Sequence, residues 1–184
     1  HIYFKNIHFV NVLIKKINAC RKIEINCIKN SGDFRKSDIV LDIGSGDGYW
    51  TNYFGKFCSK ITGVEPYQEH LNIAKKNYSC NCYFVSGSAE NLEFDSDSFD
   101  KVISVCTFEH FYNDAVAFSE INRVLKPGGK LLATVDSLNS DYISEDYKKK
   151  HMKECYCAQL FTLESITKKL SQVGFKIIEA NYII

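Results

Sequence analysis

An acidic residue and three glycines at alternate positions follow a short apolar stretch in this chain of 184 residues. The run is Val40-Leu41-Asp42-Ile43-Gly44-Ser45-Gly46-Asp47-Gly48. Each glycine allows a tight turn of the backbone and lets a ligand approach the main chain, where a side chain would block it. The run therefore predicts a strand, then a nucleotide-binding loop, then a helix.

The spacing of the glycines indicates what kind of nucleotide would bind. It is G-x-G-x-G, whereas dinucleotide-binding turns have G-x-G-x-x-G. Asp42 and Asp47 place carboxylates on both sides of the loop, and a pyrophosphate favours a helix N-terminus without fixed negative charge. The loop is thus better suited to a ligand with a positive charge than to NAD.

A second acid stands where such a fold binds ribose. Residues 60–65, Lys-Ile-Thr-Gly-Val-Glu, predict a strand that ends at Glu65. In nucleotide sites of this type, an acid after the second strand accepts hydrogen bonds from the ribose hydroxyls. Together, the loop and Glu65 predict a ligand that carries a ribose and a positive charge.

Two further blocks follow, namely 84–94 with 99–104, and Leu125-Lys126-Pro127-Gly128-Gly129-Lys130-Leu131. The glycine loop at 41–48 and the segment 63–66 precede them. In this order the four blocks, which span about residues 39–136, resemble the motifs of the class I S-adenosylmethionine-dependent methyltransferases. The resemblance implies S-adenosylmethionine as the cofactor. It assigns the following residues to the cofactor site: Asp42, Gly44, Ser45, Gly46, Gly48, Glu65, Pro66, Ser88, Ala89, Glu90 and Cys106.

One of these positions departs from the family pattern. Relatives commonly have aspartate where Ser88 stands, to accept a hydrogen bond from the adenine amine. A serine hydroxyl accepts the same bond more weakly. We therefore expect a weaker adenine contact in this chain, with Ala89 contributing through its backbone.

Two histidines are candidate bases on the side of the methyl acceptor. His110 follows the strand expected at 100–106, and the pair Glu109-His110 resembles the quinone-biosynthesis and small-molecule branch of the family. Histidine can serve as a base near neutral pH, although a capping or pocket-lining role explains His110 equally well. His151 lies in a tyrosine-rich connection over 137–161, whose length is typical of a lid.

The elements that must position these residues alternate between strand and helix. This order predicts a doubly wound α/β fold, with a mostly parallel, Rossmann-like sheet flanked by helices. We expect strands at 39–43, 60–65, 82–86, 100–106, 130–136 and 175–183. We expect helices at 47–57, 68–77, 113–125 and 162–173, with Asn113 and Thr162 as N-caps. An N-terminal helical segment within 1–30 is expected from the apolar stripe of Ile7, Val10, Ile14 and Ile17.

These elements predict a single domain over 1–184, with a cofactor-binding core at 39–136. The family fold has a seventh, antiparallel strand between the fifth and sixth, and we find no residues left to form it. The sheet is therefore expected to lack this strand. The empty position would leave unpaired backbone groups, to which a partner or a second copy could bind.

Composition narrows the possible classes of protein. Hydrophobic residues make up 45% of the chain, the net charge is +1, and Arg21, Arg35 and Arg123 are its only arginines. A nucleic-acid binder usually has a concentrated basic face with arginine forks. No apolar run approaches the roughly 20 residues that span a bilayer, and the first residues lack the order of a signal peptide. We therefore expect a cytoplasmic protein without membrane insertion.

The eight cysteines do not have the spacing of a structural zinc site. Cys80 and Cys82 are separated by one residue, as are Cys155 and Cys157, whereas structural zinc usually uses C-x-x-C turns. Reduced thiols in apolar surroundings explain the remaining cysteines. We expect no metal.

These observations predict methyl transfer to an oxygen, nitrogen or carbon atom of a small molecule. Methylation of a protein or RNA is an alternative, but such enzymes often have an Asn/Asp-Pro-Pro-aromatic run after the fourth strand, where this chain has Cys106-Thr107-Phe108-Glu109. A second alternative is a non-catalytic subunit that keeps the fold to bind or activate a partner. Ser88 and the missing strand favour that alternative, and the intact glycine loop and Glu65 oppose it.

Overall fold

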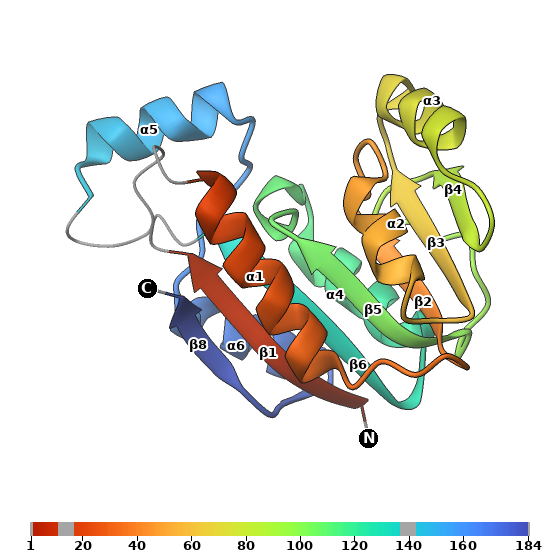
Figure 1. The fold of residues 1–184 in the computed structure, drawn as a ribbon. Coiled ribbons are helices and arrows are strands. Elements are labelled where there is room, and N and C mark those ends of the chain that lie inside the picture. Colours follow the sequence, from red (N-terminus) through yellow and green to blue (C-terminus); the bar gives the residue numbers. More distant parts are fainter. Residues whose placement is uncertain (1, 11–16, 137–142, 184) are drawn as a thin grey trace.

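The computed structural model describes residues 2–10, 17–136 and 143–183, with side chains described within 21–135 and 143–180. They form one sheet with helices on both faces (Figure 1). The strands are β1 Ile2–Val10, β2 Ile39–Ile43, β3 Lys60–Glu65, β4 Cys82–Ser86, β5 Phe99–Val105, β6 Leu125–Asp136, β7 Phe175–Ile177 and β8 Ala180–Ile183. The helices are α1 Ile17–Gly32, α2 Tyr49–Gly55, α3 Gln68–Asn77, α4 Asp114–Val124, α5 Glu145–Glu154 and α6 Leu163–Gln172, with a short 3-10 helix, η2 Phe108–His110.

The strands lie in the order β4-β3-β2-β5-β6-β1-β7, and β8 pairs with β1 beyond the end of β7. Every pairing between these strands is parallel. The carboxyl ends of the strands therefore meet at one edge of the sheet. Ligands of open α/β sheets bind at that edge.

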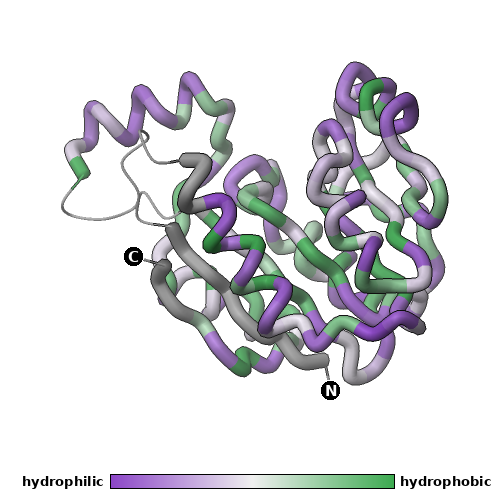
Figure 2. The backbone as a smooth tube through the Cα atoms, viewed as in Figure 1, coloured by the Kyte–Doolittle hydropathy of each residue, from purple (hydrophilic) through white to green (hydrophobic). Residues whose placement is uncertain are grey.

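Successive residues of the central strands pack on opposite faces of the sheet, as the pleat of a strand requires. Val40, Ile103 and Leu132 belong to one core cluster, which includes residues of α1, α2 and α3. Leu41, Val102 and Leu131 belong to the other, with residues of α4 and α6. The predicted doubly wound α/β fold is therefore confirmed. Figure 2 shows hydrophobic stretches along the strands, whereas α5 is largely hydrophilic.

Most of the predicted elements are confirmed within a few residues. The strands expected at 39–43, 60–65 and 82–86 and the helix expected at 68–77 have the bounds that we predicted. The strand expected at 130–136 begins earlier, at Leu125, and the one expected at 175–183 is divided into β7 and β8. Asn113 and Thr162 are N-caps, since their side chains accept hydrogen bonds from Val116 N and Ser165 N.

The predicted helical segment at the N-terminus is wrong for its first part. Ile7 and Val10 lie in the strand β1, while Ile17 begins α1 and Ile14 lies outside the described residues. Residues 2–10 are rich in β-branched and aromatic side chains, which favour strands. Apolar spacing in so short a run does not separate helix from strand.

The sheet has no empty position where we expected one. β1 lies between β6 on one side and β7 and β8 on the other, with registers such as Tyr3↔Lys130 and Ile7↔Ala180. The prediction that this position is empty is therefore wrong, because a segment that we had assigned to helix fills it. β1 is parallel to its neighbours on both sides, so the described strands still lack the antiparallel strand that the resemblance implies. Within the described strands, no free backbone edge remains at that position to bind a partner or a second copy.

Candidate functional site

The glycine loop begins directly after β2, at the carboxyl edge of the sheet. Gly44, Gly46 and Gly48 all have left-handed φ angles, of 74°, 52° and 84°, which L side chains rarely adopt. A Cβ on Gly44 would lie 2.4 Å from the Thr107 side chain, and one on Gly48 would lie 2.7 Å from the Phe84 ring. A Cβ on Gly46 would meet nothing within 4 Å. The outer glycines are thus required for packing, and Gly46 leaves open space at the tip of the loop.

Glu65 ties the end of β3 to this loop. The residue is 5% exposed, and its Oε2 accepts a hydrogen bond of 2.9 Å from Gly46 N. Its Oε1 accepts from Tyr67 N at 3.1 Å and lies 3.6 Å from His70 Nδ1. A carboxylate has about four acceptor sites. Glu65 therefore keeps acceptor capacity for hydroxyl groups of a ligand.

Ser45 places a hydroxyl inside the loop. The residue is buried, and its backbone N–H donates to Val64 O at 3.1 Å. Its Oγ is buried and has no hydrogen-bond partner within the described residues. Buried hydroxyls in folded proteins nearly always have a partner. The loop therefore offers both an unused polar group and, at Gly46, the room for a ligand.

We expected Asp42 to place its carboxylate beside the loop. The structure instead buries this carboxylate between β2 and α2. The residue is 2% exposed, and its Oδ2 accepts a hydrogen bond of 2.6 Å from Thr51 Oγ1 of α2. The pKa of Asp42 is raised to about 7. Burial is the main cause, the hydrogen bond from Thr51 acts in the opposite direction, and the charge of Glu65 adds to the rise. Asp42 thus joins β2 to α2, while Asp47 is the exposed carboxyl of the loop.

The segment after β4 runs beside the start of α4. Asn91 N donates to Ser88 O at 3.2 Å, and Ala89 is buried. Glu90 Oε1 accepts from the backbone N–H groups of Tyr112 at 3.0 Å and Asn113 at 3.5 Å. Glu90 therefore holds the start of α4, which was not foreseen. The cofactor roles of Ser88, Ala89, Glu90 and Pro66 stay predictions.

His110 ends η2 and is exposed. Its Nδ1 lies 3.2 Å from the backbone oxygen of Tyr156. A carbonyl oxygen only accepts hydrogen bonds, so this contact places the ring proton on Nδ1. In the neutral ring, Nε2 then carries the lone pair and is the nitrogen that can accept a proton.

The segment 155–159, which follows α5 in the chain, is hydrogen-bonded to η2 and to the residue after it. Glu109 O accepts from Ala158 N at 2.8 Å and from Gln159 N at 3.2 Å, and Gln159 Nε2 donates to Phe111 O at 3.1 Å. Together with the contact between His110 and Tyr156, these bonds hold the end of α5 against the carboxyl edge of the sheet.

His151 lies in the last turn of α5, just before this segment. Its Nδ1 is 3.7 Å from Cys155 Sγ, and its ring stacks on Tyr147 with 6.3 Å between the centroids. Its Nε2 is buried and, within the described residues, has no hydrogen-bond partner. Both candidate bases thus contact the residues that follow α5, His110 at Tyr156 and His151 at Cys155, and the role of each stays a prediction.

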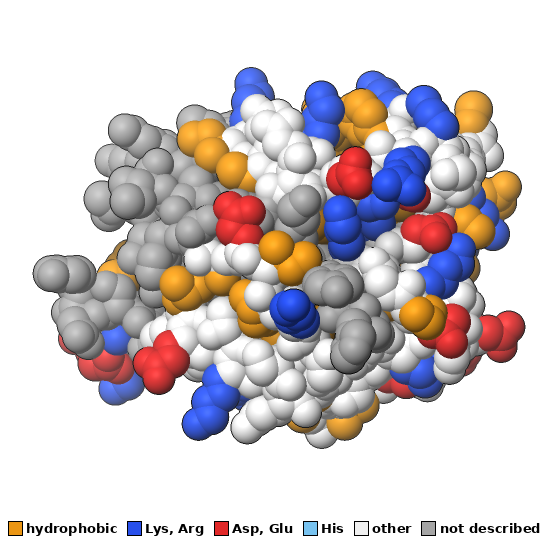
Figure 3. Space-filling view, turned by 90° about the horizontal axis from the view of Figure 1, so that it is seen from below, with side chains coloured by type: hydrophobic (Ala, Val, Ile, Leu, Met, Phe, Trp, Pro, Cys, Tyr) orange, Lys and Arg blue, Asp and Glu red, His pale blue; other side chains and the backbone are white. Residues whose placement is uncertain are grey.

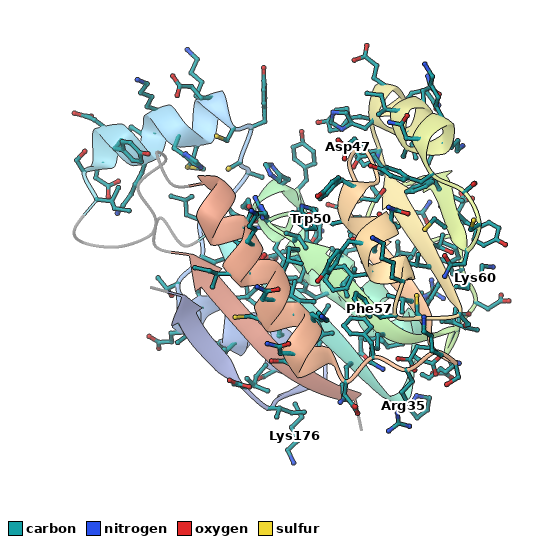
Figure 4. All side chains as sticks on the ribbon, in the orientation of Figure 1. Arg35, Asp47, Trp50, Phe57, Lys60 and Lys176 are labelled. Carbon is teal, nitrogen blue, oxygen red and sulfur yellow. The ribbon has the colours of Figure 1, made fainter. Side chains whose placement is uncertain are left out.

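A polar cavity of about 250 Å³ lies elsewhere, at the amino edge of the sheet. Its lining includes Asp38 and Lys101, which form a buried ion pair, and Asp100, which accepts from Lys126 Nζ at 2.9 Å. Figure 3 shows side chains of both charges on this edge. Figure 4 places Arg35 of the cavity and Asp47 of the glycine loop at opposite ends of the molecule. The cavity is therefore separate from the candidate site.

No group of three or more histidine, cysteine, aspartate or glutamate side chains in the part of the chain that the structure describes is placed to hold a metal ion. None of the helices in the same ranges combines the length and the apolar character needed to cross a membrane.

Comparison with known proteins adds to this geometry. Residues 41–133, half of the chain, match a family model described as a methyltransferase domain. The demethylmenaquinone methyltransferase of Chlorobaculum tepidum is 37% identical over 91 residues, which are 49% of this chain and 37% of the relative. The sterol 24-C-methyltransferase of Kluyveromyces lactis is 27% identical over 162 residues, which are 80% of this chain and 43% of the relative.

A solved structure is similar over most of the chain. The phosphoethanolamine N-methyltransferase 2 of Haemonchus contortus, in complex with S-adenosyl-L-methionine, is 27% identical with a TM-score of 0.74. The similar region covers 83% of this chain and 36% of that one. The chain spans less than half the length of the curated relatives named above.

Proposed function

Because the chain belongs to the methyltransferase domain family, we propose that it binds S-adenosylmethionine at the glycine loop and transfers a methyl group to a small molecule. S-adenosylmethionine is the cofactor that the family and the similar solved structure support. The observation that carries the proposal is the bond between Gly46 N and Glu65 Oε2, which joins the loop and the ribose-type acid into one site.

The residues at this edge fit the chemistry of the cofactor. Glu65 would accept the ribose hydroxyls, and the backbone of 44–48, with the Ser45 hydroxyl, would hold the methionine part. Ser88 and Ala89 would contact the adenine. When bound, the cofactor supplies an activated methyl group on a positively charged sulfur. The exposed Asp47 gives the loop a nearby negative charge.

The acceptor side needs alignment first and a base only for some acceptors. Methyl transfer requires that the two reacting atoms be held in line at about 3 to 3.5 Å. An acceptor with a hydroxyl or carbon-bound proton also requires a base. His110 would take that proton at Nε2, because the Tyr156 carbonyl holds the other nitrogen in its protonated form.

A small-molecule acceptor is favoured over protein or RNA. The curated relatives are named for demethylmenaquinone and sterol methylation. The residues after β5, Cys106-Thr107-Phe108-Glu109, differ from the Asn/Asp-Pro-Pro-aromatic run of many protein and nucleic-acid methylases. Two features of the sequence favoured a non-catalytic subunit. Ser88 remains, but the empty strand position does not, because β1 fills it.

The location of the protein is a separate proposal. A cytoplasmic location, which we expected from the sequence, stays a prediction. Fractionation of cells that express the tagged chain tests it, and recovery with membranes would contradict it.

Calorimetric titration with S-adenosylmethionine, and separately with NADH, tests the proposal. We expect saturable binding of the first only, and at least about tenfold weaker binding to Glu65→Ala, because a buried carboxylate with hydroxyl partners is lost. Glu69→Ala, which removes an exposed acid of α3, is the matched control and should bind as the wild type does. Absence of binding to the wild-type chain would overturn the proposal.

A further inference from the structure

A buried carboxylate of α1 lies at the centre of a polar cluster near the ends of β5 and β6. Glu24 is 3% exposed, and its Oε2 lies 2.8 Å from Arg21 Nη1 and accepts from Thr134 Oγ1 at 3.1 Å. Cys106 Sγ lies 3.5 Å from the same oxygen. One carboxylate oxygen thus joins α1, β6 and the residue that follows β5.

Cys106 is held in an unfavourable backbone conformation. Its φ is 47°, in the left-handed region that residues with a Cβ rarely adopt. Its N–H donates to Thr134 O at 2.9 Å, and its Sγ lies 3.6 Å from Thr134 Oγ1. Such conformations persist only where surrounding contacts hold them. Here those contacts converge on Glu24 and Thr134.

The next residue links this cluster to the glycine loop. The Thr107 side chain lies against Gly44, where a Cβ would come within 2.4 Å of it. Thr107 Oγ1 also donates to Val105 O at 3.2 Å. The conformation of Cys106 sets the direction of the chain into Thr107. It therefore also sets the surface on which the first glycine of the loop packs.

We infer that Glu24 is a positioning residue for the cofactor site, which acts by holding Cys106 in its left-handed conformation so that Thr107 supports the glycine loop. The inference rests on the proposed function, and it adds a residue of α1 to a site otherwise formed by the ends of β2, β3, β4 and β5.

Affinity for S-adenosylhomocysteine, the demethylated form of the cofactor, tests this role by calorimetry. Glu24→Leu should weaken binding about tenfold, the effect of losing one or two net hydrogen bonds. Glu24→Gln keeps an acceptor oxygen and should recover most of that affinity. Glycine adopts the left-handed conformation without support. In a Cys106→Gly background, Glu24→Leu should therefore change the affinity less than about twofold.

A second buried acid separates positioning from general stability. Asp38 is buried in an ion pair with Lys101 at the opposite edge of the sheet, so Asp38→Leu should lower the melting temperature without changing the affinity. All titrations are done at a temperature where each variant is folded. If Glu24→Leu does not fold, Thr134→Val removes one donor with little change of shape, and its loss of affinity should also disappear with Cys106→Gly.

The outcomes distinguish this inference from the proposed function. Absence of binding to the wild-type chain would overturn the proposed function and this inference with it. If the wild type binds and Glu24→Leu binds equally well, the inference alone is overturned. An equal loss of affinity in the Cys106 and Cys106→Gly backgrounds would also overturn it, because Glu24 would then act without the strained residue.

Discussion

Asp42 couples the site to pH through its burial. Its carboxyl lies between β2 and α2, where burial raises its pKa from 3.8 to about 7. In that interval the folded chain keeps a proton that the unfolded chain has released. The free energy of unfolding therefore falls as pH rises from about 4 to about 7, and the loss is complete above that range.

Asp42→Asn should remove this pH dependence. The amide oxygen can still accept from Thr51, and the variant has no charge to bury. Relative to the wild type, we expect the variant to gain at least about 1.4 kcal/mol of unfolding free energy between pH 4 and pH 8, the equivalent of one pKa unit. Urea unfolding at a series of pH values measures this difference. Asp47→Asn, at the exposed carboxyl of the loop, is the control, and equal pH profiles for Asp42→Asn and the wild type would contradict the prediction.

Helix α6 begins with two side chains that cap each other's backbone. Ser165 N donates to Thr162 Oγ1 at 3.0 Å, and Thr162 N donates to Ser165 Oγ at 2.9 Å. Both bonds satisfy N–H groups that the helix itself leaves unpaired. The cap fixes the start of a helix whose buried side, at Ile166 and Leu170, covers the sheet.

Thr162→Ala should therefore destabilise the fold by about 1 kcal/mol, the usual value of an N-cap side chain. Chemical denaturation measures the change. Thr167→Ala is a matched control on the same helix, because the Thr167 hydroxyl bonds back to Leu163 O at 2.8 Å and Glu164 O at 3.0 Å, and alanine has the higher helix propensity. A loss at Thr162 no larger than that at Thr167 would show that the cap contributes little.

The strands and helices that the sequence predicts best are those with clear local limits. Residues 60–65 and 68–77 are short periodic stretches, separated by Pro66 and Tyr67, and their bounds were correct. Residues 2–10 were predicted wrongly, because strand and helix differ little in apolar spacing over so few residues. Pairing with β6, β7 and β8, which follow more than a hundred residues later, settles the outcome.

The candidate site was predictable where its residues lie in one motif. The glycines and Glu65 come from two neighbouring parallel strands, so their proximity follows from the predicted sheet. Thr107 and Thr51 were not identified, because their partners lie on other elements. The burial of Glu24 had a signal in the sequence. It neighbours Ile25 and precedes Ile28 by four residues, and both isoleucines lie on the side of α1 that packs on the sheet.

The first strand of the chain is an interior strand of the sheet. β1 pairs over six residues with β6 on one side and with both β7 and β8 on the other (Figure 1). β7 and β8 have no other described strand partner. The C-terminal strands are thus attached to the rest of the sheet through the N-terminal one, and the two ends of the chain stabilise each other.

Removal of residues 1–10 should therefore destabilise both ends together. The loss should be on the order of several kcal/mol, since each net backbone hydrogen bond contributes about 1 kcal/mol. The exposed edge of β6 should also promote association, because unpaired strand edges bind other strands. Urea unfolding and light scattering measure the two effects. A synthetic peptide of residues 1–10 should reverse both by adding the strand back, whereas a shortened chain that stays monomeric and as stable as the intact one would show that β6 and β7 do not depend on β1.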